Sequence, residues 1–321
     1  MAIVNSRLDP ALDAEFEAST DLLGDAARLS ARMRESGYLF FRRLVPSESV
    51  LAARREMLRA CGEAGWLARG TAVEDGIAAP GVAWTEPEPE FMAVYNRIQC
   101  GEAFHALALA PALLAMLEAL FGEQALAHSR NIARIIFPQN TLHTTPSHQD
   151  YIHVQGTEET YTAWMPLGDC PQDLGSLAVL EGSHRSGIWP VHRAYGAGGV
   201  GIDTSELPFR WVGGDFGIGD VIVFHSLTVH KALPNMSADR IRLSVDYRYQ
   251  PLSHPVSVAS LQPHHGQVKW PEVYADWKSE EHKYYWQNLP IRTAELDPRV
   301  QAVRGGVDSA PLPPTASPSA Q

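Results

Sequence analysis

The sequence predicts a mainly β protein with flanking helices and a helical N-terminal portion. Up to about residue 125 the apolar residues recur with helical spacing. From about residue 126 onward, short β-branched or aromatic segments alternate with turn residues. Strands at this density, without helical patterns between them, are typical of an antiparallel sandwich or barrel. The chain of 321 residues can bury one large core or two modest ones.

The N-terminal portion has clear start and stop signals. Gly37 and Gly122 stand where helices end in a left-handed residue, and Pro111 stands in a first helical turn. In order, we expect a helix at 22–37, a strand at 38–45, a helix at 47–65, a long loop at 67–90 and a helix at 110–123.

The second portion reads as strands joined by turns. The expected strands are "NIARIIFP" at 131–138, "YTAWMPLGD" at 161–169, "SLAVLEGSH" at 176–184, "DVIVFHSL" at 220–227 and "IRLSVDYRYQ" at 241–250. The segment at 185–215 contains "GAGGVG" and is too long for a hairpin turn. We expect it to form a loop over one mouth of the barrel.

Charge and cysteine content exclude several classes of protein. The net charge of -11 disfavours a nucleic acid or an anionic membrane as partner. Three cysteines without CxxC spacing disfavour a disulfide scaffold or a structural zinc site. No signal peptide is visible, and the apolar stretch at 104–121 reads as a buried helix because Pro111 and Glu118 interrupt it. We expect a cytoplasmic protein.

The stretch "TTPSHQDYIHV" at 144–154 carries candidate metal ligands. On a strand, His148 and Asp150 share one face and Gln149 points the other way. Two such ligands and a third from elsewhere would form the two-histidine, one-carboxylate set of non-haem Fe(II) oxygenases. A tripeptide of this kind also occurs by chance, and the alternative is a pair of solvated polar residues in a loop.

A second pattern downstream favours the metal site. The stretch "GDVIVFHSLTVHKALPN" at 219–235 offers His225 and His230 as the third ligand. The strand that follows carries Arg240 and Arg242. Burying an arginine inside the protein costs free energy unless its charge is paired with an anion. A dicarboxylate cosubstrate that chelates the metal with one end and meets an arginine with the other would supply that anion.

The order of four motifs resembles the phytanoyl-CoA dioxygenase-like family. The motifs are HxD, then "LEGSH", then "GD" followed by two histidines and "PN", and finally "DRIRLS". Members of the family are Fe(II)/2-oxoglutarate-dependent oxygenases on a double-stranded β-helix, a cupin-like jelly roll. The resemblance covers roughly 30–250, with Glu181 a departure where the family usually has proline. It implies one catalytic domain at 1–304, divided into a helical part at about 1–125, a jelly-roll core at about 126–255 and a C-terminal extension at 256–304. We expect a disordered tail at 305–321.

The resemblance implies roles for individual residues. His148, Asp150 and His230 would be the metal ligands, and "PN" after His230 favours it over His225. Arg242 with Ser244 would bind 2-oxoglutarate, with Arg240 as the alternative to Arg242. Further candidates for the cosubstrate are Ser176, Thr145 and Arg97.

The implied reaction consumes O2 and 2-oxoglutarate and releases succinate and CO2. The related halogenases lack the aspartate ligand, so Asp150 argues for hydroxylation or desaturation of an unactivated C–H bond. The substrate pocket should involve the loop at 67–90, the strand around Tyr95, Tyr151 and the loop at 185–215. Trp84 and Trp189 there suggest a largely apolar small molecule. The alternative is a metal-binding, cupin-like isomerase or sensor without oxidative chemistry, which has no reason for an arginine on the last strand.

Overall fold

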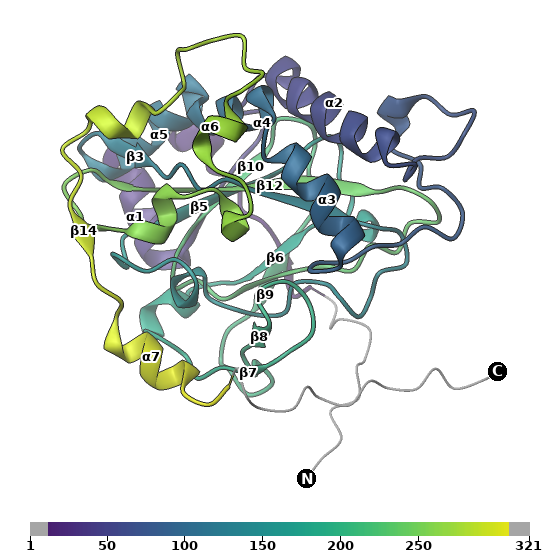
Figure 1. Ribbon diagram of the computed structural model, residues 1–321. Helices are drawn as coiled ribbons and strands as arrows, with labels where there is room; N and C mark the ends of the chain where they lie inside the picture. Colours follow the sequence, from purple (N-terminus) through teal and green to yellow (C-terminus); the bar gives the residue numbers. More distant parts are fainter. Residues whose placement is uncertain (1–11, 308–321) are drawn as a thin grey trace.

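Two β-sheets that face each other form the centre of the molecule (Figure 1). The computed structural model describes residues 12–307. The six strands of the larger sheet are, in spatial order, β2 (Tyr38–Phe41), β10 (Val221–His225), β5 (Tyr161–Pro166), β12 (Arg242–Pro251) and β3 (Ala125–Ala127), with β4 (Ile132–Ile136) also paired to β12. The smaller sheet has the order β1 (Ala14–Glu15), β9 (Trp211–Gly213), β6 (Leu177–Leu180) and β11 (His230–Ala232).

All five strands expected after residue 126 are present. Side chains of both sheets, among them Trp164, Val179 and Phe224, form one apolar cluster between the sheets. The ten-residue strand β12 is the longest, and it pairs antiparallel with β3, β4 and β5. Because every one of its residues is buried, both faces of β12 lie inside the molecule.

Helices cover the outer face of the larger sheet. They are α1 (Ala26–Ser36), α2 (Ser47–Glu63), α3 (Pro89–Ile98), α4 (Glu102–Ala106) and α5 (Pro111–Phe121). Their apolar residues pack with the outward side chains of the sheet in the largest core cluster. The predicted stop of α1 is confirmed, since Gly37 has φ 77° and donates its N–H to the Met33 carbonyl at 2.9 Å. A Cβ there would lie 2.4 Å from His184 Nδ1, so glycine is required.

The segment at 185–215 differs from the expected loop. It contains the strands β7 (His192–Arg193) and β8 (Val200–Gly201), and it ends in β9, which pairs with β6. Buried backbone N–H and C=O groups need partners, and a neighbouring strand supplies them. The strand predicted at 38–45 is present as β2, and it pairs with β10 of the core.

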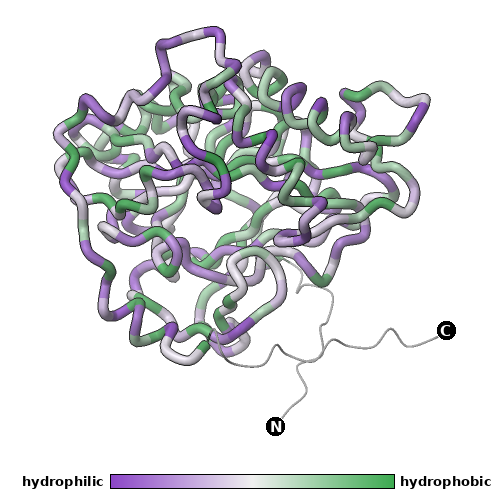
Figure 2. Tube along the Cα trace, in the orientation of Figure 1, coloured by the Kyte–Doolittle hydropathy of each residue, from purple (hydrophilic) through white to green (hydrophobic). Residues whose placement is uncertain are grey.

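The C-terminal extension runs along the side of the sheets. It contains β13 (Val256–Ser257), α6 (Trp270–Val273), β14 (Thr293–Ala294) and α7 (Pro298–Arg304), and its aromatic residues form a separate cluster around Trp270 and Trp286. Figure 2 shows that the loop of this extension at the top of the view is largely hydrophilic. Of the predicted tail at 305–321, residues 308–321 lie outside the described residues.

Short 3-10 turns connect these elements, at Thr20–Leu22, Val73–Asp75, Leu107–Leu109, Asp150–Ile152, Gln172–Leu174, Ser183–Ser186, Val258–Leu261, His264–Gly266 and Tyr285–Asn288. In the described part of the chain, one helical stretch, Glu102–Phe121, is long and apolar enough to span a membrane. It comprises α4, a 3-10 turn and α5, and its residues Leu113 and Leu117 are fully buried in the main core.

Candidate metal centre and adjoining pockets

The two faces of β12 carry different chemistry. Its outward residues, Leu243, Val245, Tyr247 and Tyr249, belong to the main apolar core. The alternate residues of the strand are Arg242, Ser244, Asp246, Arg248 and Gln250, all buried. Arg242, Asp246 and Arg248 line a pocket between the sheets. This pocket is the candidate site.

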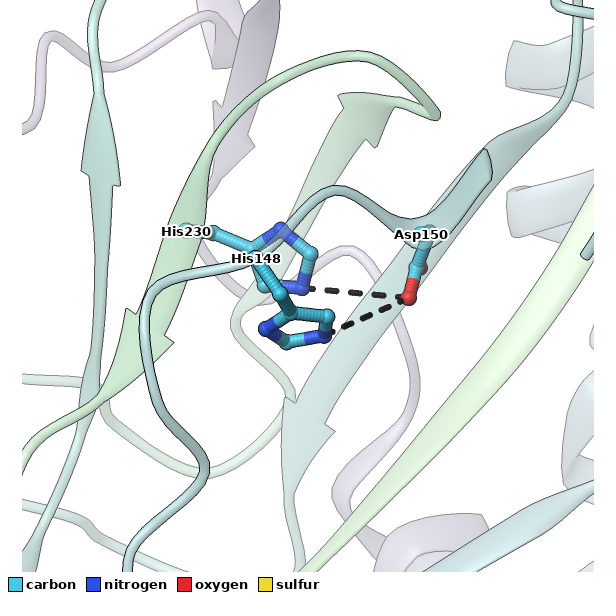
Figure 3. Close-up of side chains that lie close together, drawn as sticks. All are labelled: His148, Asp150 and His230. Carbon is cyan, nitrogen blue, oxygen red and sulfur yellow. Dashed lines mark ion pairs between the residues drawn. The ribbon is translucent and has the colours of Figure 1, made fainter. Parts of the chain in front are cut away.

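His148, Asp150 and His230 meet at this pocket. Their ligand-capable atoms lie within 4.8 Å of one another, and Figure 3 shows the side chains pointing toward one another. Asp150 Oδ1 lies 3.6 Å from His148 Nε2 and 3.9 Å from His230 Nε2. The segment at 144–154 is not a strand, and its pairing is a single bridge between His148 and His230. His148 and His230 exchange two backbone hydrogen bonds of 3.0 Å, and the 3-10 turn beginning at Asp150 follows. His225, the alternative ligand, lies by Glu159 instead.

Backbone carbonyls orient both histidine rings. Nδ1 of His148 lies 2.8 Å from the Pro146 carbonyl, and Nδ1 of His230 lies 3.0 Å from the Thr228 carbonyl. A nitrogen facing a carbonyl carries the proton, so each Nε2 keeps its lone pair toward Asp150. Burial and the nearby His148 lower the pKa of His230 to about 3, which keeps that ring neutral. Two imidazole nitrogens and one carboxylate fit a divalent iron ion.

Arg248 and Thr162 hold the carboxylate of Asp150. Arg248 Nη2 donates to Oδ1 at 3.0 Å and to Oδ2 at 3.2 Å, and the Thr162 hydroxyl donates to Oδ2. Burial alone would raise the pKa of Asp150, but the Arg248 guanidinium holds it well below its ordinary value. Our sequence prediction missed Arg248. Its position two residues after Asp246 and six after Arg242 on β12 is the signal that could have identified it.

Arg242 is buried in the same pocket and keeps an unused donor. Its Nη1 donates to the Ser244 hydroxyl, and its Nε has no partner among the described residues. Its guanidinium carbon lies 5.9 Å from the centre of the Trp164 ring, and burial lowers its pKa to about 10. A buried cation with an unpaired donor is costly, so an anion in the pocket would stabilise it. The carboxylate of 2-oxoglutarate has the required charge and planar shape.

The other cosubstrate candidates lie at varying distances from the pocket. Thr145 lines it, whereas Arg240 is exposed and lines a different cavity, which Arg242 also lines. Ser176 is fully buried, its hydroxyl has no partner among the described residues, and it does not line the pocket. Arg97 is exposed at the end of α3, where it lies 3.4 Å from Glu63.

A second pocket adjoins the first and shares Arg134 and Thr145 with it. It is formed by the loop at 67–90 through Trp84 and Glu86, by β4, and by Ala197 of the loop at 185–215. Both predicted loops therefore meet here. Trp84 lines this pocket, as expected of a substrate-contacting residue, and the sequence prediction missed Glu86 and Arg134.

The other substrate candidates do not line either pocket. The strand predicted around Tyr95 is wrong, because Tyr95 lies on the buried face of the helix α3. Its side chain is part of the core, and its hydroxyl lies 2.6 Å from His264 Nδ1. Tyr151 is buried and donates to Asp297 of the C-terminal extension at 2.8 Å. Trp189 is half-buried, and its backbone N–H donates to the Gln149 side chain at 2.9 Å.

Comparison with known proteins gives one family. The family model of phytanoyl-CoA dioxygenase (PhyH) matches residues 33–244. Two curated relatives are the 1-deoxypentalenic acid 11-beta-hydroxylases of Streptomyces arenae and Streptomyces exfoliatus. They are 27% and 26% identical to this chain, over 82% of it and 92% of each relative.

Solved structures show the same fold. The non-haem alpha-ketoglutarate-dependent epimerase SnoN from nogalamycin biosynthesis is 20% identical, with a TM-score of 0.50 over 76% of this chain and 90% of that one. EctD from S. alaskensis with bound Fe is 19% identical, with a TM-score of 0.50 over 78% and 84%.

The chain belongs to the phytanoyl-CoA dioxygenase family. It is an Fe(II)/2-oxoglutarate-dependent oxygenase, as the resemblance implied. The predicted jelly-roll core with flanking helices is confirmed.

Proposed function

Within this family, we propose that the enzyme hydroxylates an unactivated C–H bond of a small, largely apolar molecule and releases succinate and CO2. The observation that carries the proposal is one buried pocket with two facing parts. His148, Asp150 and His230 converge on one side of it, and Arg242 presents an unpartnered Nε on the other. The first set would hold Fe(II), and Arg242 with Ser244 would hold the far carboxylate of 2-oxoglutarate.

When bound, Fe(II) with 2-oxoglutarate and O2 supplies the oxidising chemistry that inserts oxygen into a C–H bond. The protein orients the reactants. Arg248 donates to both carboxylate oxygens of Asp150 and Thr162 donates to Oδ2, so the carboxylate is fixed with Oδ1 directed at the histidines. Phe224 and Leu177 line the same pocket and exclude water from it.

The substrate enters from the second pocket. Its walls include Trp84, Phe91 and Ile135, which favour an apolar carbon skeleton. The curated relatives are named for 1-deoxypentalenic acid, a small secondary metabolite. We infer that this enzyme also acts on a secondary metabolite of similar size.

An anaerobic titration tests the ligand assignment. Fe(II) and 2-oxoglutarate added to the protein should produce a visible charge-transfer band, and H230A should lose it while H225A keeps it. A band that survives in H230A would contradict the assignment. A succinate-release screen over a library of terpenoid and polyketide compounds then identifies substrates, and product analysis by mass spectrometry distinguishes hydroxylation from desaturation.

A further inference from the structure

Arg134 stands between the two pockets and has unused hydrogen-bond donors. It lines both pockets, and its side chain retains 16% exposure. Its Nε donates to Asp246 Oδ2 at 2.8 Å, which is the one hydrogen bond of its guanidinium with the described residues. The Nη nitrogens are therefore available to a molecule that passes from the second pocket toward the metal centre.

Glu86 places a negative charge in the second pocket. Its carboxylate Oε1 lies 3.4 Å from His265 Nε2, and its side chain is 20% exposed. Burial would raise the pKa of Glu86, but the hydrogen bond to His265 and the charge of Arg134 lower it. The carboxylate therefore stays ionised at neutral pH and faces the space that the substrate must cross.

The charges around the two pockets cancel. Arg134, Arg242 and Arg248 line the pockets with three positive charges, and Asp246 and Glu86 line them with two negative charges. The third negative charge is that of Asp150, which Arg248 contacts at 3.0 Å. This count takes the histidines as neutral. Fe(II) and the dianion of 2-oxoglutarate cancel each other, so the loaded site holds no cation in excess. A substrate carboxylate would bring an unpaired charge into a largely buried site, which is unfavourable.

We propose that the second pocket selects uncharged substrates that carry a hydroxyl or carbonyl group, and that Glu86 excludes carboxylic acids. Arg134 donates to the substrate oxygen, and Glu86 accepts from a substrate hydroxyl. Both interactions leave the charge balance of the site intact. The inference rests on the proposed function, since it assumes that the second pocket holds the substrate.

Matched probes test the selection. Terpenoid carboxylic acids, 1-deoxypentalenic acid among them, are compared with their methyl esters and primary alcohols. Binding is measured by equilibrium dialysis at pH 8 against anaerobic protein loaded with Fe(II) and 2-oxoglutarate. We expect the neutral member of a pair to bind more tightly. E86Q should shift the acid-to-alcohol affinity ratio toward the acid on the order of tenfold or more, because it removes one nearby unit charge.

The control is E88Q in the same loop. Glu88 accepts from the Thr85 backbone N–H at 2.6 Å and does not line either pocket, so its loss should leave the ratio unchanged. H265Q is a second variant that keeps the Glu86 carboxylate, and it should still exclude acids. Tighter binding of acids by the wild type, an unchanged ratio in E86Q, or no binding of any neutral probe overturns the inference. Each of these outcomes leaves the charge-transfer band in place, whereas failure of the proposed function removes the band.

Discussion

The outer and inner faces of β12 are equally buried but are built differently. On the outer face, the hydroxyls of Tyr247 and Tyr249 donate to the carbonyls of Phe104 at 2.5 Å and Ala108 at 2.7 Å. On the inner face, Arg242 Nε and two nitrogens of Arg248 have no partner among the described residues. Apolar packing with satisfied polar groups stabilises a fold, whereas unpaired buried donors destabilise it. The outer face therefore serves stability, and the inner face is arranged for ligands that carry negative charge or accept hydrogen bonds.

The largest expected effect is on the inner face, at the metal centre. D150A removes a ligand atom and leaves Arg248 without its carboxylate partner. We expect it to abolish succinate release that depends on substrate and to abolish retention of Fe(II) after desalting, measured by a colorimetric iron assay. Wild-type turnover in D150A would exclude Asp150 as a ligand.

Arg242 gives the next largest effect. R242M should raise the KM for 2-oxoglutarate on the order of ten- to a hundredfold, because a hydrogen bond to a charged group contributes roughly 1.5–3 kcal/mol. Its free energy of unfolding should not fall, since replacing an imperfectly paired buried charge by an apolar side chain is often neutral or stabilising. R240M is the matched control with an exposed arginine two residues earlier on the chain. An increase in KM with R240M alone would exchange the two assignments.

The outer face should show the opposite pattern. Val245 is fully buried in the main core, and V245A removes two carbon atoms from it. We expect a loss of about 2 kcal/mol in the free energy of unfolding, measured by urea denaturation. The KM for 2-oxoglutarate should stay unchanged. A large change in that KM would show that the two faces are coupled.

An effect that appears only in acid is expected on the helical side of the larger sheet. Burial lowers the pKa of His105 in α4 to about 4, against an ordinary value of 6.5. Below pH 6.5 the His105 imidazole is protonated in the unfolded chain but stays neutral in the folded protein until the pH approaches 4. The stabilisation is therefore complete above pH 6.5 and is lost as the pH falls toward 4, by up to about 1.4 kcal/mol per pH unit. H105Q should flatten the pH dependence of the unfolding free energy between these values, whereas V245A should retain the wild-type slope.

Local patterns in the sequence predicted the strands, the helix ends and the order of the site residues. The spacing of His148 and Asp150, and the "PN" after His230, pointed to the three side chains that the structure brings together. The sequence did not decide between Arg240 and Arg242. One is exposed and the other is buried in the pocket, and that difference depends on where β12 begins.

The substrate candidates were harder to predict from residue type. Tyr151 directly follows Asp150 and Tyr95 follows the loop at 67–90, but their hydroxyls bond to Asp297 and His264 at other places in the fold. Conversely, the sequence did not show that Glu86 and Arg134 line the second pocket. An acidic residue in a loop and an arginine in a strand are both common, so neither residue type points to a site.

The sequence by itself determined the family, the jelly-roll class and the three candidate metal ligands. Hydrophobic periodicity and the order of motifs are properties of the linear chain, so both can be recognised without knowing which residues meet in space. The tertiary structure alone decided which polar side chains share a pocket. Arg134 pairs with Asp246 across 112 positions and Arg248 with Asp150 across 98. Such pairs form because sheet register brings residues that are distant in sequence within a few ångströms of each other. Burial then makes an unpaired charge costly in free energy, so the paired arrangement is favoured.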